Sequence, residues 1–298
     1  MSGRASRVGL VVVTYSPGET LDAFLDTLEK ATTRPYGVVL ADNGSTDGAP
    51  ERAALRPGVE LVRTGGNLGY GRAANLAVPQ APGEWVVVAN PDLRWEPSAL
   101  DTLVEAVERW PRAGSLGPAI LSPDGTLYPS ARALPSLGRG IGHALLGWWW
   151  PSNPWTAAYR RERGAPEEGP TGWLSGSCLL LRREAFETVG GFDPAYFMYF
   201  EDLDLCERIG RAGWQNVYVP AAVVVHEGGH STSRDPGAMA DAHHASAWRY
   251  LSGRYAGWRW APVRLVLRAG LVGRAALARR VPAVAAGARP ARRIRRSG

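Results

Sequence analysis

Short apolar runs alternate with helical segments along the first half of the chain. Apolar runs of strand length cover residues 8–14, 36–42, 59–64 and 84–90. Helices are predicted over residues 20–30, after the glycine-rich turn near residue 69, and over residues 97–110, where apolar side chains recur on one face. Strands that alternate with helices in this way predict an α/β fold whose mostly parallel sheet is covered by helices on both faces.

The second half is less regular. Residues 130–170 are rich in Gly, Pro and Trp and predict an irregular insertion. Regular patterns resume with a strand and a short helix over residues 173–191, a helix over 201–212, and two strands over 214–220 and 221–227. We therefore expect a main domain over residues 1–240, followed by a helical C-terminal region over residues 241–298.

The charge of the chain divides at the same boundary. The 298 residues carry a net charge of +6, but residues 242–298 hold 13 arginines and no acid, which leaves residues 1–241 with a net charge of −7. Arginines among Leu, Val and Ala favour a tail that lies on an anionic membrane surface, and the tail is too interrupted to span a bilayer. Nucleic-acid binding is the rival interpretation of a basic tail. We expect no nucleic-acid partner, because the body is acidic and lacks an aromatic stacking platform.

Only two cysteines occur, Cys178 and Cys206, each in an apolar context. This usage is typical of a reducing compartment and argues against disulfides and a zinc site. The first apolar run begins at Val8, which leaves no room before it for a secretory signal. We therefore expect a protein of the cytoplasmic side of the membrane. The oligomeric state is not predictable from these features.

Polar residues follow two of the predicted strands. The segment "DNGSTD" begins at Asp42, and "NPD" ends at Asp92. Ligands of open α/β sheets bind where the carboxyl ends of the strands meet the loops. Asp42 can therefore accept hydrogen bonds from a base or a ribose, although a capped turn has the same composition. Asp92 can hold a hard divalent cation, although it can equally cap the next helix.

The glycine-rich turn "GGNLGYGRAAN" reverses the spacing of a dinucleotide-binding fingerprint, and no P-loop occurs. Backbone N–H groups at this helix start, with Arg72, could approach an anionic ligand, or the glycines could form only a tight turn. His226 ends a β-branched run. It is either a structural residue or, if it faces Asp92, part of a site for Mg²⁺ or Mn²⁺.

The stretch "YFMYFEDLDLCERIG" places four acids directly behind a run of aromatic residues. Acids at a helix start interact favourably with the helix dipole, which accounts for Glu201, Asp202 and Asp204. The aromatic run suggests more, because apolar surroundings raise the pKa of a carboxyl group and make it a better base near neutral pH. Glu207, one turn later, is expected to be a solvated helix acid.

Together these motifs resemble the inverting family 2 glycosyltransferases of the GT-A fold. The resemblance covers about residues 8–230 and is carried by "VVVTYSPGE", "ADNGSTDG", "GGNLGYGRAAN", "VVVANPD", "WLSGSCLLLRREAFETVGGFD", "YFEDLDLCERIGRAGW" and "VVHEGGHS". It implies a Rossmann-like sheet and a divalent cation as cofactor. Asn90 stands where the family's metal-binding D-x-D motif has its first acid, which gives His226 more weight as a ligand beside Asp92.

The resemblance also implies a role for each matched residue. Asp202 would be the catalytic base, and Asp92 and His226 would hold the metal. The donor nucleotide would contact Thr14, Tyr15, Asp42, Asn43, Gly69, Arg72, Asn75, Asn90 and Asp92. The acceptor would contact Trp173, Ser175, Gly176 and Glu201.

Further segments, among them "ANPDLRW" and "YPSARALPSL", resemble the rhamnosyltransferases of this family that act in cell-wall linkage-unit synthesis. They imply that dTDP-L-rhamnose is the donor and that the acceptor is the 3-hydroxyl of a polyprenyl-diphospho-GlcNAc at the cytoplasmic face of the membrane. Two alternatives stay open. One is a family 2 enzyme with another nucleotide sugar or glycan acceptor, and the other is a sugar-nucleotide binder without activity.

Overall fold

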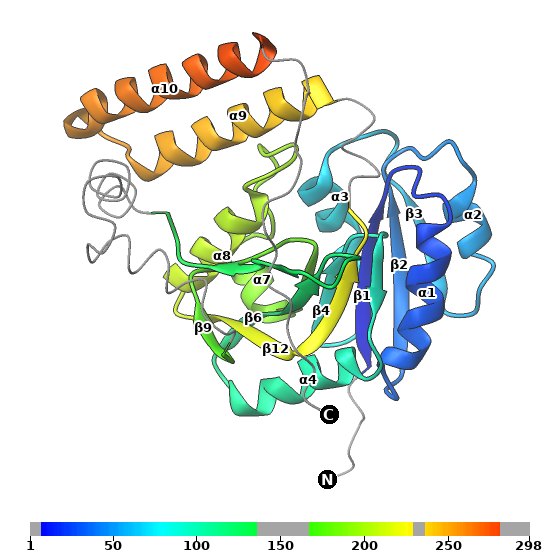
Figure 1. Cartoon of the computed structure of the whole chain (residues 1–298). Helices are drawn as coiled ribbons and strands as arrows, with labels where there is room; N and C mark the ends of the chain where they lie inside the picture. Colours follow the sequence, from blue (N-terminus) through cyan, green and yellow to red (C-terminus); the bar gives the residue numbers. More distant parts are fainter. Residues whose placement is uncertain (1–6, 136–166, 229–235, 281–298) are drawn as a thin grey trace.

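The computed structural model describes residues 7–135, 167–228 and 236–280. Figure 1 shows one twisted sheet with helices on both faces and a pair of long C-terminal helices set to one side. Most of the predicted insertion, residues 136–166, lies outside the described residues, but short strands occur at both of its margins.

The main sheet has ten strands. Eight of them follow the order β3-β2-β1-β4-β11-β6-β12-β5. The first half is parallel and consists of β3 (Val59–Arg63), β2 (Tyr36–Asp42), β1 (Val8–Thr14) and β4 (Trp85–Ala89). In the second half, β11 (Cys178–Arg182) runs antiparallel to both β4 and β6 (Ala113–Leu121), and β12 (Gln215–His226) is parallel to β6.

Short strands complete the architecture. Antiparallel to β12 run β5 (Leu93–Trp95) and β9 (Gly169–Thr171), and β7 (Leu127–Tyr128) pairs with β6. A separate two-stranded sheet joins β8 (Ala131–Arg132) to β10 (Trp173–Leu174). The α/β fold is thus confirmed: β1–β4 form an all-parallel half, and β6 and β12 run in the same direction beyond the antiparallel β11.

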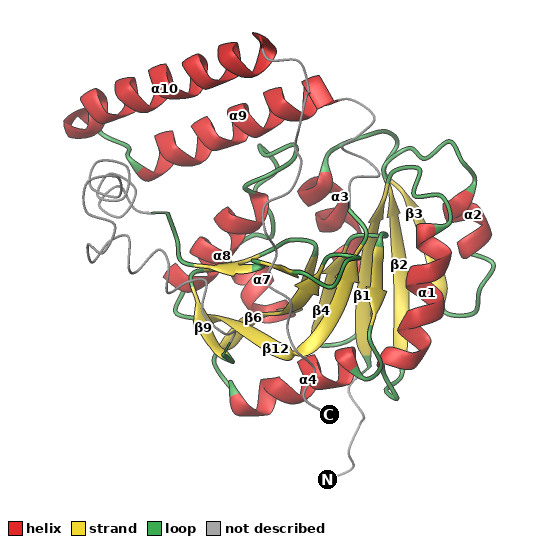
Figure 2. Cartoon of the chain, viewed as in Figure 1, coloured by secondary structure: helices red, strands yellow, loops and turns green. Residues whose placement is uncertain are grey.

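Helices cover both faces of the sheet (Figure 2), and a hydrophobic core lies on each face. On one face pack α1 (Thr20–Ala31), α2 (Ala49–Ala53) and α4 (Ala99–Arg109). On the other pack α3 (Tyr70–Ala77), α7 (Arg183–Thr188) and α8 (Glu201–Arg211). Because side chains alternate along a strand, Leu10 and Val12 of β1 enter the first core and Val11 and Val13 the second. This explains why the runs are continuously apolar.

The last strand corrects one expectation. Residues 214–227 were predicted as two strands, whereas β12 is one strand of 12 residues. Its pairing with β6 shifts register between Val219 and Val223, around Pro220. A proline has no N–H to donate to a ladder, so the strand bulges there and then continues. The bulge carries β12 on to the edge of the sheet where its last residue, His226, lies.

The described part of the basic C-terminal region, up to residue 280, is helical as predicted, with α9 (Pro236–Arg254), the 3-10 turn η2 (Trp258–Trp260) and α10 (Ala261–Arg280). α9 packs on the body of the protein. Ser246 donates a hydrogen bond of 2.8 Å to the carbonyl of Met198, and Arg249 pairs with Asp193 at 2.8 Å. Within the described residues, no helix is both long and apolar enough to cross a membrane.

Docking of α9 also corrects the expectation for Glu207. This side chain is not solvated but only 8% exposed. It accepts hydrogen bonds from the Tyr250 hydroxyl at 2.5 Å and from Arg211 at 2.7 Å, and it pairs with Arg254. The tail helix therefore covers an acid of α8 that the helical pattern alone would place in water.

Candidate active site

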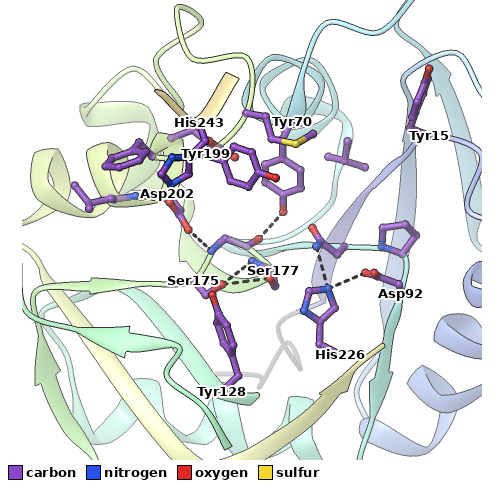
Figure 3. Close-up of a pocket in the computed structure, with 18 of the residues that line it drawn as sticks. Tyr15, Tyr70, Asp92, Tyr128, Ser175, Ser177, Tyr199, Asp202, His226 and His243 are labelled. Atoms are coloured by element: carbon purple, nitrogen blue, oxygen red, sulfur yellow. Dashed lines mark hydrogen bonds and ion pairs between the residues drawn. The ribbon is translucent and has the colours of Figure 1, made fainter. Parts of the chain in front are cut away.

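A deep pocket opens at the carboxyl edge of the sheet, where β1, β4 and β12 end (Figure 3). β11 runs antiparallel to its neighbours, so the residues before it, rather than those after it, reach the same edge. Segments far apart in sequence therefore meet there. The predicted site residues that line the pocket are Tyr15, Asn43, Asn90, Asp92, Trp173, Ser175, Gly176, Glu201, Asp202 and His226.

On one side of the pocket, Asp92 and His226 face each other. His226 Nε2 lies 3.1 Å from Asp92 Oδ1 and 3.4 Å from the Asn90 side-chain amide. The register of β5 against β12 produces this meeting, because His226 pairs with Leu93, the neighbour of Asp92. No third His, Cys, Asp or Glu of the described residues completes a metal-binding group here. A carboxylate and an imidazole nevertheless suit Mg²⁺ or Mn²⁺, which keeps water and substrate oxygens as further ligands.

On the other side, the carboxyl group of Asp202 is held by backbone amides. The N–H of Gly176 donates to Oδ2 and that of Leu203 to Oδ1, each at 2.8 Å. Burial raises the pKa of Asp202, and the two amides partly offset the rise by stabilising the charged form. Each oxygen keeps a second lone pair and the residue lines the pocket, so the carboxylate can accept a proton from a bound hydroxyl.

Glu201 is the most perturbed acid of the pocket. It is only 7% exposed, and its Oε2 has no hydrogen-bond partner in the described structure. Burial, with the nearby charge of Asp202, raises the pKa of Glu201 to about 8. Two adjacent buried carboxyl groups repel each other when both are charged, so at neutral pH the protonated form of Glu201 is favoured beside ionised Asp202.

Gly176 links Asp202 to Tyr70 through hydrogen bonds of its backbone N–H and carbonyl. Its carbonyl accepts a hydrogen bond of 2.6 Å from the Tyr70 hydroxyl, while its N–H is bound to Asp202. A Cβ at this position would lie 3.0 Å from the Cβ of Asp202. Glycine therefore permits the close approach that orients the carboxylate without crowding Asp202. Ser175 and Ser177 are hydrogen-bonded to each other at 3.2 Å beside it.

The residues predicted to bind the donor fall into two groups. Tyr15 and Asn43 reach the pocket, and Tyr15 is 39% exposed. Thr14 and Asp42 lie beneath them and are buried. Asp42 Oδ1 accepts hydrogen bonds from the Thr14 hydroxyl at 3.2 Å and from the N–H of Ser45 at 3.0 Å, which shapes the turn after β2.

Gly69, Arg72 and Asn75 instead anchor the loop that precedes α8. Arg72 Nε donates to the carbonyl of Pro194 at 2.7 Å, and the Asn75 amide bonds to the backbone of Phe192 in both directions. Gly69 has φ +88°, and a Cβ there would lie 2.1 Å from the carbonyl oxygen of Phe197. These contacts hold the loop over the pocket. Binding of the donor by these three residues stays a prediction.

The aromatic residues before Glu201 have different surroundings in the structure. Tyr196 is buried against Leu203 and Tyr250, whereas Tyr199 and Phe200 line the pocket. Both of the latter have left-handed backbones, with φ +67° and +66°. Such angles are costly for bulky residues, so tertiary contacts must impose them. Their effect is to turn the chain sharply and to point the first acids of α8 into the pocket.

Sequence reasoning missed three residues that line the same pocket, Tyr70, Tyr128 and Arg132, and His243 lines it as well. His243 comes from α9 and packs edge-on against the rings of Tyr199 and Phe200. Tyr70 lies in "GGNLGYGRAAN" and Tyr128 and Arg132 in "YPSARALPSL", but neither segment marks these side chains for a role. A single aromatic or basic residue carries no periodic signal, so only the fold could place it here.

Both the sequence and the fold are similar to those of known glycosyltransferases. The sequence profile described as Glycosyl transferase family 2 matches residues 10–190, and that of Glycosyl transferase family group 2 matches residues 165–280. The chain is 56% identical, over 88% of its length and 89% of the relative's, to N-acetylglucosaminyl-diphospho-decaprenol L-rhamnosyltransferase of Mycobacterium tuberculosis. It is 27% identical, over 82% and 92%, to rhamnosyltransferase WbbL of Escherichia coli.

The fold is also similar to that of a solved structure, the mannosyltransferase PcManGT from Pyrobaculum calidifontis in complex with GDP-Man and Mn²⁺. The TM-score is 0.56 at 20% identity, with 92% of this chain and 76% of the other covered. This likeness confirms the predicted GT-A fold. From the matching profile, the identity to the mycobacterial enzyme and the shared fold, we conclude that the chain belongs to glycosyl transferase family 2 and is a glycosyltransferase.

Proposed function

We propose that this enzyme transfers L-rhamnose from dTDP-L-rhamnose to the 3-hydroxyl of a polyprenyl-diphospho-GlcNAc in cell-wall linkage-unit synthesis. The observation that carries the proposal is the pairing, in one pocket, of an amide-held carboxylate at Asp202 with the Asp92–His226 pair opposite. Rhamnose and the lipid-linked GlcNAc acceptor follow the name of the relative that is 56% identical over 88% of this chain, whereas dTDP and the 3-hydroxyl are what the family resemblance implies.

The mechanism is a single displacement with inversion. The acceptor oxygen attacks the anomeric carbon of rhamnose, and Asp202 takes the proton of that hydroxyl. The bond from the anomeric carbon to the diphosphate oxygen breaks, and its electron pair leaves with dTDP. Asp202 suits this role because its oxygens keep free lone pairs and because burial raises its pKa toward the working pH.

Asp92 and His226 would hold a divalent cation, Mg²⁺ or Mn²⁺. When bound, that ion would supply positive charge where the leaving diphosphate becomes more negative. The residues of this chain fit the group, since a carboxylate oxygen and an imidazole nitrogen converge in the pocket. The acceptor sugar would then lie in the pocket against Asp202 and the adjoining wall formed by Trp173, Ser175 and Gly176.

The test is transfer from a panel of nucleotide sugars to GlcNAc-diphospho-polyprenol, with and without EDTA. We expect turnover with dTDP-L-rhamnose that is lost in EDTA. Turnover with a UDP- or GDP-sugar alone would contradict the rhamnose assignment and favour another family 2 activity. Nucleotide binding without any transfer would contradict the enzymatic role.

We also propose that residues 241–298 attach the enzyme to the cytoplasmic face of the membrane, where a lipid-linked acceptor lies. The outward side of α10 is apolar, with Leu265 and Val266 each 71% exposed and Val272 61% exposed. Two arginines of the same helix contact neighbouring segments of the chain. Arg264 donates to the carbonyls of Tyr255 and Gly257, and Arg268 stacks on Trp248 at 5.6 Å.

This arrangement supports a lipid surface as the partner of α10, because apolar side chains can enter the interface while the acid-free tail attracts anionic headgroups. Flotation with phosphatidylglycerol vesicles tests it. Leu265→Glu combined with Val266→Glu should abolish flotation. Leu55→Glu, a change at an 85% exposed leucine of the body, should not. Equal flotation of both variants would contradict the proposal.

A further inference from the structure

Arg132 is the only lysine or arginine among the described residues that line the pocket. It lies on β8, where the pairing with β10 sets it opposite Trp173. Its guanidinium carbon is 5.3 Å from the centre of the Trp173 ring and 5.6 Å from that of Tyr128. Figure 3 shows Tyr128 beneath Ser175, on the same side of the pocket as Asp202. Arg132 thus belongs to the side of the pocket that holds the proposed base.

The guanidinium group has donors to spare. Its Nε donates to the carbonyl of Pro129 at 2.7 Å, which fixes the plane of the group. The two terminal nitrogens make no hydrogen bond or ion pair with any residue that the structure describes. Other arginines near α8 are matched with acids, as Arg208 is with Asp204 and Arg254 with Glu207. Burial raises the pKa of the Asp202 carboxyl group, and the positive charge of Arg132 lowers it.

A guanidinium group held in this orientation can bind an anionic group of a ligand. Stacking on two aromatic rings orients the planar group without neutralising it. A guanidinium with free terminal nitrogens matches phosphate oxygens in a two-pronged arrangement. Because the side chain is already ordered by Pro129, Trp173 and Tyr128, binding an anion costs less conformational entropy than it would for a free arginine.

We propose that Arg132 binds the diphosphate of the lipid-linked acceptor. The inference rests on the proposed function, which places two diphosphates in one pocket. That of the donor belongs with Asp92 and His226, on the opposite side. The acceptor's diphosphate is attached to the sugar whose 3-hydroxyl faces Asp202, so it lies on the side where Arg132 is. Arg132 thereby selects acceptors that carry a diphosphate and sets the sugar's hydroxyl toward the base.

Three acceptors with the same short prenyl or alkyl chain test this role: a GlcNAc diphosphate, a GlcNAc monophosphate and an uncharged GlcNAc glycoside. We expect Arg132→Gln to lower kcat/KM for the diphosphate acceptor by about 10- to 100-fold, the effect of losing a hydrogen bond between charged groups. The loss should appear in the KM for the acceptor, with the KM for the donor unchanged. The uncharged glycoside should be used equally well by the variant and the wild type, and Arg132→Lys should recover part of the loss.

The matched control is Arg109→Gln on α4, which removes an exposed arginine paired with Glu168 away from the pocket. It should leave all three acceptors unchanged. An equal loss by Arg132→Gln on every acceptor would show that Arg132 only supports the wall around Asp202, and would overturn the inference. So would an unchanged preference for the diphosphate.

Binding of inorganic pyrophosphate, measured by calorimetry in EDTA with dTDP present, separates this inference from the proposed function. The wild type and Arg109→Gln should bind it alike, and Arg132→Gln at least about tenfold more weakly. That result would stand even if the acceptor sugar proved to be another. Absence of pyrophosphate binding in the wild type would overturn the assignment of an anion site, whichever sugars the enzyme transfers.

Discussion

Asp92 and Asp202 face the same pocket but are held by different kinds of partner. Asp92 lies beside an imidazole, His226, at the end of two strands. Asp202 lies at the start of a helix, between two backbone amides and next to a second buried acid, Glu201. An acid beside a further metal-ligating group suits a cation, whereas an acid held by neutral dipoles in an apolar wall suits proton transfer. The environment, rather than the residue type, separates the two roles.

The largest effect that would sharpen this contrast is expected from Asp202→Asn. The amide keeps the shape of the side chain but cannot take a proton, so turnover should fall by about 10²–10⁴-fold, the usual contribution of a general base. Affinity for dTDP, measured by calorimetry, should be unchanged. Because burial raises the pKa of Asp202, wild-type kcat/KM should rise as the pH increases through that pKa, and the variant should lack this limb.

The matched control is Asp204→Asn, which removes a carboxylate of the same helix that is bound to Arg208. Its turnover should stay close to that of the wild type. Near-normal turnover of Asp202→Asn would show that another group is the base. The proposed difference in role between Asp92 and Asp202 would then be wrong.

The next effect concerns the other side of the pocket. Asp92→Asn should lower turnover by about 10²-fold or more, because a bound cation contributes several kcal/mol of charge stabilisation. Binding of Mn²⁺ itself, followed by calorimetry or electron paramagnetic resonance, should weaken in Asp92→Asn and not in Asp202→Asn. Turnover that survives EDTA, or Mn²⁺ binding that follows Asp202, would reverse the two assignments.

The smallest expected effect is on stability. Burial raises the pKa of Glu201 to about 8 from an ordinary value of 4.5, so the folded state binds this proton more tightly than the unfolded state. The free energy of unfolding should therefore fall as the pH rises from about 4.5 to about 8, by at most roughly 1.4 kcal/mol for each unit of pKa difference.

Glu201→Gln should remove this loss, so the variant should gain stability relative to the wild type between pH 6 and pH 9 in denaturant titrations. The control is Glu105→Gln, a change at an exposed acid of α4. It should change the free energy of unfolding by the same amount at pH 6 and at pH 9. The same pH dependence in the wild type and in Glu201→Gln would mean that Glu201 is charged in the folded protein, and the contrast between the two sides of the pocket would weaken.

The order of apolar and polar residues was enough to predict the elements and the polar groups at their ends. Continuous apolar runs located β1, β2 and β4, because buried strands need apolar side chains on both faces. Polar residues directly after those runs pointed to Asp42 and Asp92. The family motifs then supplied roles for Asp202 and His226, which line the pocket together.

Only the tertiary structure decided which segments meet. The antiparallel direction of β11 brings Gly176 to the carboxyl edge of the sheet, and no periodic pattern records the direction of a strand. Docking of α9 buries Glu207, which the helical pattern placed in water. Arg132 owes its place in the pocket to a ladder with Trp173, 41 positions away in the sequence. Apolar periodicity reports local burial, whereas the position of a single charge depends on contacts between distant segments.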